Sequence, residues 1–225
     1  MANNYLYLIT DLAALSIPFI ASFYPKAPFY KEWNRFLKGL LLMGILFLPW
    51  DILYTHLGVW GFNDEYLTGI KLINLPIEEW LFFICIPYAS VFTFFSLSHL
   101  VKSNPLDKYI WKINGSLIIL LVVFTLLNYN KLYTSVTFIL LAGLLIYHQL
   151  RKTEWLSLFY LSFIFILLPF FIVNGILTGS WIEGEIVWYN NLENIGFRMG
   201  TIPVEDTFYG MLMLLLTIWG FKASK

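Results

Sequence analysis

Apolar segments of about 20 residues recur along the chain, and they constrain its fold more than any other feature. About 20 residues are needed for a helix to cross the hydrocarbon core of a bilayer. Of the 225 residues, 59% are hydrophobic and 12% are charged, whereas soluble domains carry about 25% charged residues. We therefore expect an all-α integral membrane protein with seven transmembrane helices. The expected spans are 5–24, 37–55, 78–99, 113–128, 132–150, 155–174 and 205–221.

The basic residues are divided unevenly between the two sides that seven spans define. Eleven of the 14 Lys and Arg residues, Lys225 among them, fall on one side, and Lys71, Lys131 and Arg198 fall on the other. Cytoplasmic loops are enriched in Lys and Arg. We therefore expect a multi-pass protein of the cell membrane with its N-terminus outside and its C-terminus in the cytoplasm.

Charge and motif content argue against several classes of function. The formal net charge is zero, so a nucleic-acid partner is not expected. The chain has no glycine-rich nucleotide-binding motif, and its single cysteine, Cys85, allows no CxxC pair. We expect neither a cofactor nor a metal ion.

One acidic motif occurs twice, at positions 127 residues apart. Residues 69–79 and 196–206 both fit the pattern G-x-K/R-x-x-N/T-L/I-P-I/V-E-E/D. Upstream, residues 59–60 and 62–63 (Val-Trp and Phe-Asn) resemble residues 187–190 (Val-Trp-Tyr-Asn). Two copies that enter the membrane in the same direction are typical of parallel repeats.

The motif spacing predicts how the chain is divided. We expect one membrane domain, 1–225, made of two parallel three-helix repeats joined by a connecting helix. Repeat one is expected in 1–101, the connector in 102–130 and repeat two in 131–225.

Each motif ends in two adjacent acids at the start of an apolar helix: Glu78 with Glu79, and Glu205 with Asp206. Acids in a first helical turn can simply stabilise the helix, but ionisable groups in a membrane are costly and usually functional. Adjacent residues of a helix point about 100° apart, so only one acid of each pair can face a given cavity. We expect Glu78 and Glu205 to face a shared cavity.

The remaining acids and the basic residues of the motifs have their own expected places. Glu79 and Asp206 are expected to pair with Lys71 and Arg198 at the rim of the cavity. Asp51 in the second span is a further candidate catalytic acid. For Asp11 in the first span we expect a structural hydrogen bond between helices.

Aromatic and polar residues surround the two motifs. Aromatic residues can form the belt at a membrane interface, but here they also flank the paired acids. One protonated and one ionised carboxyl in a site of low dielectric constant is the arrangement that acid–base catalysis needs. The candidate substrate-binding residues are Trp50, Trp60, Phe82, Phe83, Asn174, Thr178, Trp188 and Tyr189.

Both halves resemble a known family. Residues 49–51 (Pro-Trp-Asp), 58–60 (Gly-Val-Trp) and 75–83 (Leu-Pro-Ile-Glu-Glu-Trp-Leu-Phe-Phe) resemble the first unit of the membrane-integral, flavin-independent lycopene cyclases. Residues 174–178, 187–190 and 202–206 resemble their second unit. The chain thus resembles a fused form of the heterodimeric bacterial and archaeal carotenoid cyclases.

The resemblance implies an activity. It implies an isomerase that converts lycopene through γ-carotene to β-carotene by proton-initiated, redox-neutral ring closure, with Glu78, Glu79, Glu205 and Asp206 as the functional acids. A carotenoid substrate and membrane lipid are the expected partners, and other carotenoid-pathway enzymes are candidates. Two alternatives stay open: a seven-helix small-molecule transporter, since small transporters share this repeat plan, and a carotenoid-binding membrane protein without catalysis.

Overall fold

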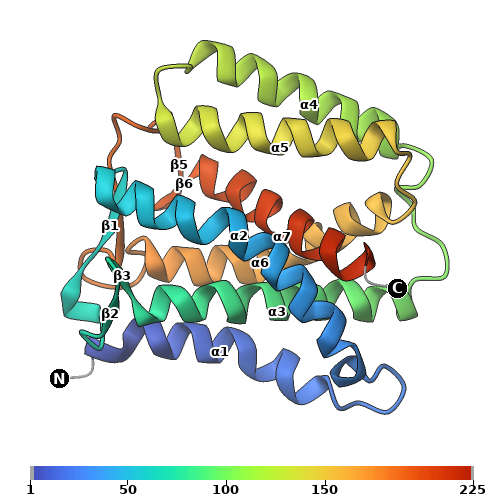
Figure 1. Ribbon diagram of the computed structural model, residues 1–225, viewed down its shortest axis with the longest axis horizontal. Helices are drawn as coiled ribbons and strands as arrows, with labels where there is room; N and C mark the ends of the chain where they lie inside the picture. Colours follow the sequence, from blue (N-terminus) through green and yellow to red (C-terminus); the bar gives the residue numbers. More distant parts are fainter. Residues whose placement is uncertain (1–2, 224–225) are drawn as a thin grey trace.

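Seven α-helices make up most of the computed structural model, which describes residues 3–223 (Figure 1). Lys225, counted above among the basic residues, lies outside the described residues. The helices are α1 (Leu6–Ala21), α2 (Trp33–Leu57), α3 (Ile77–Leu100), α4 (Ile110–Leu127), α5 (Leu132–Leu150), α6 (Leu156–Leu177) and α7 (Val204–Ala223). Short 3₁₀ helices lie at Asn3–Tyr5, Phe29–Glu32 and Asp64–Tyr66. The expected seven-helix, all-α fold is confirmed.

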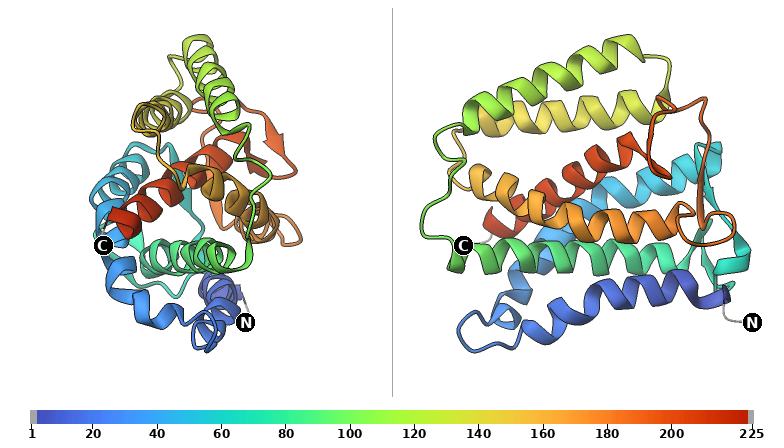
Figure 2. Two further views of the ribbon diagram at one scale, coloured as in Figure 1. Left: turned by 90° about the vertical axis from the view of Figure 1, so that its right-hand side faces the viewer. Right: turned by 180° about the vertical axis from the view of Figure 1, so that it is seen from behind.

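The helices have the length and composition of membrane spans. Six of them are long and apolar enough to cross a bilayer, and α1 is a shorter apolar helix. Its 16 residues rise about 24 Å. The start of the chain and all the strands lie at one end of the bundle, and the end of α7 lies at the other (Figures 1 and 2). An odd number of crossings produces this arrangement, and the fold is that of a multi-pass membrane protein.

The two halves of the chain interlock through their helices. Within each half the first helix packs against the third, as α1 does against α3 and α5 against α7. The second helix crosses over: α2 packs against α7, and α6 packs against α3. Helix α4 packs beside α5 at the edge of the bundle (Figure 1). Residues from both halves therefore share one hydrophobic core.

Three small antiparallel sheets cover the end of the bundle that holds the start of the chain. Strands β2 (Lys71–Leu72) and β3 (Leu75–Pro76) form one hairpin, and β5 (Arg198–Met199) and β6 (Ile202–Pro203) form its counterpart. The third sheet joins the repeats, because β1 (Trp60–Phe62) pairs with β4 (Val187–Tyr189).

Hydrogen bonds next to this joint sheet show how the repeats align. The Asn63 N–H donates to the carbonyl oxygen of Ile186, and the Asn190 N–H donates to that of Val59, both at 2.9 Å. The two bonds are related by the motif offset, which aligns Val59 with Ile186. The match of Val59-Trp60 to Val187-Trp188 expected from the sequence is therefore wrong by one residue.

Close contact between α2 and α7 depends on glycine. A Cβ at Gly39 would lie 2.2 Å from the carbonyl oxygen of Thr217, too close for any side chain. We expect Gly39→Ala to lower the free energy of unfolding by about 1–3 kcal/mol, because the helices must separate. Gly44→Ala is the control, since its Cβ would lie 3.6 Å from Leu48 in ordinary contact. Thermal unfolding in detergent measures both variants, and equal melting temperatures would refute the expectation.

Candidate active site

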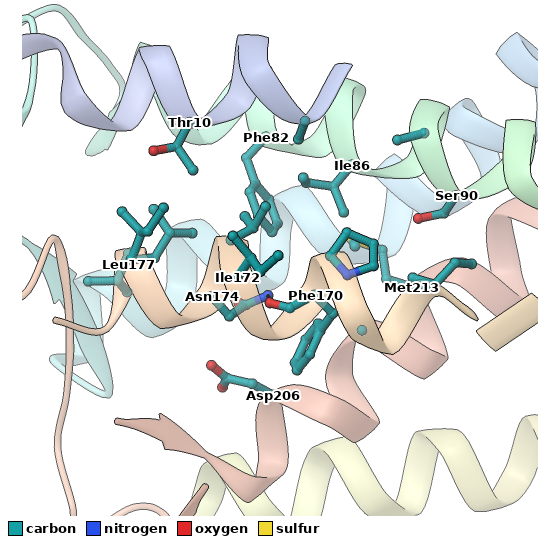
Figure 3. Close-up of a pocket in the computed structure, with 18 of the residues that line it drawn as sticks. Thr10, Phe82, Ile86, Ser90, Phe170, Ile172, Asn174, Leu177, Asp206 and Met213 are labelled. Carbon is teal, nitrogen blue, oxygen red and sulfur yellow. Dashed lines mark hydrogen bonds between the residues drawn. The ribbon is translucent and has the colours of Figure 1, made fainter. Parts of the chain in front are cut away.

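A cavity of about 540 Å³ lies between α1, α3, α6 and α7. We call it the chamber. Figure 3 shows side chains of these four helices around the space, with Thr10 from α1 facing α6 and Asp206 below it. Its walls are mostly apolar, formed by residues such as Phe82, Ile86 and Met213. A mostly apolar pocket with a few convergent polar groups is the usual form of a small-molecule site.

Three carboxyl side chains line the chamber: Asp51 from α2, Glu79 from α3 and Asp206 from α7. They come from both halves of the chain. No Lys, Arg or His side chain is among the described residues that line the chamber. Within residues 3–223, no group of three acidic, Cys or His side chains is placed to hold a metal ion. The three carboxyls therefore share an apolar site that contains no cationic side chain.

Glu78 does not face the chamber, which makes that part of the expectation wrong. Its side chain is fully buried and accepts a hydrogen bond of 2.7 Å from the backbone N–H of Thr68. This bond ties the start of α3 to the loop before β2. The rotation of about 100° between neighbouring residues then directs Glu79 into the chamber.

Glu205 behaves in the same way in the second half. It accepts hydrogen bonds from the Ile195 N–H at 2.7 Å and from the Thr134 hydroxyl at 2.6 Å. Ile195 lies 127 residues after Thr68, so the two bonds are equivalent. Glu205 holds a loop instead of facing the chamber, as we had expected, and Asp206 lines the chamber in its place.

The expected ion pairs at the rim are also wrong. Lys71 pairs with Asp64 at 2.8 Å. Arg198 donates to the carbonyl oxygen of Thr201 at 2.7 Å and to the Asn191 side chain at 3.0 Å. Both basic residues lie on the hairpins, whereas the second acid of each motif points inward. Within residues 3–223 neither basic residue forms a salt bridge with that acid.

Tyrosine hydroxyls hold the two motif acids in the chamber. Tyr7 of α1 donates to Glu79 Oε2 at 2.5 Å, and Tyr133 at the start of α5 donates to Asp206 Oδ1 at 2.6 Å. Each bond joins the first helix of a repeat to its third. Tyr189 of β4 donates a second bond to Asp206, of 3.0 Å to Oδ2. Asp206 therefore has a donor on each oxygen, and such bonds favour the ionised form of a carboxyl.

Burial fixes the protonation state of one of these donors. It raises the pKa of the Tyr189 phenol well above its usual range, and the Asp206 charge adds to this effect. A phenol in this environment keeps its proton and remains a hydrogen-bond donor.

Asp51 is held by an indole. The Trp60 Nε1–H donates to Asp51 Oδ1 at 2.6 Å, while the other oxygen, Oδ2, is buried without a hydrogen-bond partner. An unpaired oxygen in an apolar site favours a neutral carboxyl, because burying a charge without compensation is costly. Asp51 and Asp206 thus occupy contrasting environments in one chamber.

Half of the candidate substrate-binding residues line the chamber. These are Trp60, Phe82, Asn174 and Tyr189. The expectation is wrong for Trp50 and Phe83, which lie behind this wall. The Trp50 ring packs against Tyr209 at 5.1 Å, and the Phe83 ring packs against Phe47 at 6.3 Å.

Thr178 and Trp188 also lie away from the chamber. The hydroxyl of Thr178 shares a hydrogen bond of 2.7 Å with that of Thr201 in the β5–β6 hairpin. The Trp188 indole lies over Gly61 of the paired strand, where a Cβ would come within 2.3 Å of the ring. Both side chains stabilise the loops that cover the bundle.

Three tyrosines of the site were not identified from the sequence: Tyr7, Tyr133 and Tyr209. Tyr209 lines the chamber, and its ring packs against Trp60 at 5.9 Å and Tyr133 at 6.0 Å. The chain contains 14 tyrosines and 21 phenylalanines, so composition did not single these residues out.

Asp11 departs from its expected role. Both of its carboxyl oxygens are buried, and neither accepts a hydrogen bond from the described residues. The hydrogen bond expected between helices is not formed, because the surrounding side chains offer no donor.

Removing one donor from Asp206 tests the tyrosine contacts. We expect Tyr133→Phe to lower kcat about 10- to 100-fold with little change in KM, because a hydrogen bond to a charged group contributes about 1.5–3 kcal/mol. Tyr147→Phe in the same helix is the control, since Tyr147 is exposed and does not line the chamber. Steady-state kinetics of the purified variants supply both constants. A change in KM alone would assign Tyr133 to substrate binding instead.

The fold and the site define a class: a multi-pass helical membrane protein with a carboxyl-lined apolar chamber at the junction of two repeats. The family model described as Lycopene cyclase matches residues 4–97 and 130–223. The chain belongs to the lycopene cyclase family. Each matched segment spans three helices, α1–α3 or α5–α7, and leaves α4 outside. Neither the curated proteins nor the solved structures give a significant match.

Proposed function

We propose that this protein converts lycopene through γ-carotene to β-carotene as a redox-neutral isomerase. One observation carries the proposal: Asp51, Glu79 and Asp206 converge on a single apolar chamber whose described lining contains no basic side chain. Membership of the lycopene cyclase family supports a carotenoid substrate. The chamber supplies what proton-initiated cyclisation of a hydrocarbon needs, which is a carboxyl acid and a carboxylate base in apolar surroundings.

The chemistry balances without an oxidant. A carboxylic acid adds a proton to the CH carbon of the terminal (CH₃)₂C=CH group and leaves a tertiary cation. The neighbouring double bond attacks this cation, one C–C bond forms, and the positive charge moves into the new ring. A carboxylate then removes a proton from an adjacent carbon. One proton enters and one leaves, so substrate and product are isomers.

The hydrogen bonds support a division of roles between the acids. In the proposal Asp206 is the base, because Tyr133 and Tyr189 stabilise its ionised form. Glu79, with Tyr7 on one oxygen, is the acid that protonates the alkene. Asp51 returns the proton to Glu79 after each ring closure, in keeping with its unpaired second oxygen.

Aromatic faces in the chamber have a part in the same scheme. Trp60, Phe82, Tyr189 and Tyr209 all line the space beside the carboxyls. A cation over an aromatic face is stabilised by about 0.5–2 kcal/mol, with the larger values where water is excluded. These rings stabilise the passing carbocation and leave no nucleophile that would trap it.

The proposed placement in the membrane follows from the basic residues. We infer that the end with the strands, which holds Lys71, Lys131 and Arg198, faces outward and that the other end faces the cytoplasm. Lipid surrounds the bundle and dissolves the substrate. Other enzymes of the same pathway remain candidate partners.

Expression in a lycopene-accumulating bacterium tests the function. We expect γ-carotene to form first and β-carotene to follow, as identified by chromatography and mass spectrometry of the pigments. The purified protein should retain the activity without added flavin or nicotinamide. Unchanged lycopene, with the protein folded in the membrane, would refute the proposal and favour the transporter or carotenoid-binding alternatives.

A further inference from the structure

The chamber opens sideways between α1 and α6. Ile9 and Ile17 on α1 line it and are nevertheless 54% and 76% exposed, and Ile172 on α6 lines it and is 50% exposed. Ala13 and Pro169 also line it and are exposed. Residues 9, 13 and 17 follow one another along one face of α1. We call this opening, made by these five residues, the portal.

The surroundings of the portal determine what can pass through it. All five of its residues are apolar, and they lie on helices that are apolar along their length. In a bilayer this surface is in contact with lipid chains rather than water. The portal is therefore suited to a hydrocarbon that arrives from the membrane interior.

The chamber is shorter than the proposed substrate. Its lining on α3 extends from Glu79 to Thr93, a rise of about 21 Å. An extended chain advances about 1.15 Å per bond, as the peptide backbone does, so an acyclic C40 carotene with a main chain of about 31 bonds is roughly 35 Å long. Only part of such a molecule fits inside, and the rest must leave through the portal.

The reactive groups occupy only one end of the chamber. Glu79 and Asp206 lie in the first turns of α3 and α7, and Trp60 of the strand end holds Asp51. Further along, the polar residues of α3 that line the chamber are the hydroxyl-bearing Ser90 and Thr93. A polyene whose first end lies among the carboxyls cannot bring its second end to the same acids.

We propose that the portal admits one end of a long linear polyene to the carboxyls while the other end stays in the bilayer. The two rings of a bicyclic product are then closed in two separate binding events, with release and reversal of the molecule between them. This inference rests on the proposed function and adds how the substrate is bound and in what order its ends react.

A pulse-chase experiment tests the separate binding events. The purified protein in lipid vesicles receives labelled lycopene, and a large excess of unlabelled lycopene follows during the first turnover. We expect labelled γ-carotene to be released and to remain largely monocyclic during the chase, with β-carotene forming only after a lag. Labelled β-carotene formed without a lag and undiluted by the chase would overturn the inference. Absence of any cyclic product would instead refute the proposed function.

Bulky substitutions test the portal itself. We expect Ala13→Trp to lower the cyclisation rate at limiting substrate about tenfold or more, within the one to three decades over which association rates vary among mutants. Leu12→Trp is the matched control, because Leu12 is 49% exposed on the same helix and does not line the chamber. On α6, Ile172→Trp and Leu168→Trp form a second pair. Equal rates within both pairs, for folded variants, would exclude this route of access.

Discussion

Replacing Glu79 by glutamine is expected to lower the rate of cyclisation by about 10²- to 10⁴-fold, the range that a general acid contributes. Glu79 lines the chamber and is held there by Tyr7, and an amide cannot donate the proton that starts ring closure. The Glu79→Gln variant should still fold, because the glutamine amide keeps an oxygen that can accept the Tyr7 hydrogen bond. Pigment analysis in lycopene-accumulating cells, normalised to folded protein, measures the loss.

The neighbouring residue provides the control. Glu78 points away from the chamber and accepts a hydrogen bond from the Thr68 backbone, a role that a glutamine side chain can also fill. We expect Glu78→Gln to retain most of the activity. If Glu78→Gln were inactive and Glu79→Gln active, the placement of the two acids derived from the structure would be wrong.

Replacing Asp206 by asparagine is expected to cause a loss of the same size, about 10²- to 10⁴-fold, since it removes the proposed base. Two tyrosine hydroxyls stabilise the Asp206 carboxylate, and no other described carboxyl of the chamber receives two donors from tyrosine. Kinetics of the purified variant should show the effect in kcat, because an uncharged substrate does not need the carboxylate for binding.

Glu205→Gln is the matched control in the second half. A glutamine side chain at this position can still accept the hydrogen bonds of Ile195 and Thr134, so activity per folded molecule should remain while stability falls. We further expect Glu79→Gln combined with Asp206→Asn to be little worse than either variant alone, because residues that act as a unit are not additive. Two independent losses that multiply would contradict a single acid–base pair.

The helices could be predicted from the sequence because lipid imposes a simple requirement on them. About 20 apolar residues in succession must form a helix to satisfy their backbone groups, and the expected segments coincide with α1 to α7. The repeat was also predictable, since Pro76 and Pro203 begin equivalent helices after equivalent hairpins.

The direction of the acids could not be predicted. Glu78 and Glu79 differ in direction by about 100°, and the choice between them depends on where the backbone N–H of Thr68 comes to lie. The loop that contains Thr68 is positioned by contacts between distant segments, among them the pairing of β1 with β4. Sequence spacing carries no information on such contacts.

The tyrosine donors were missed for a related reason. Tyr7 lies 72 residues from Glu79, and Tyr133 lies 73 residues from Asp206. Only the packing of α1 on α3 and of α5 on α7 brings each pair together. In a chain that is 20% aromatic, a tyrosine in an apolar helix carries no local mark of this role.

A single-turnover reaction in heavy water tests the central claim most directly. Purified protein in excess over lycopene, equilibrated in deuterium oxide so that its carboxyl groups carry deuterium, should transfer one deuterium to each ring that it closes. The label should lie on the ring carbon that was the CH of the terminal alkene. Cyclic product that carries no deuterium at this carbon would contradict protonation by a carboxyl group in the chamber.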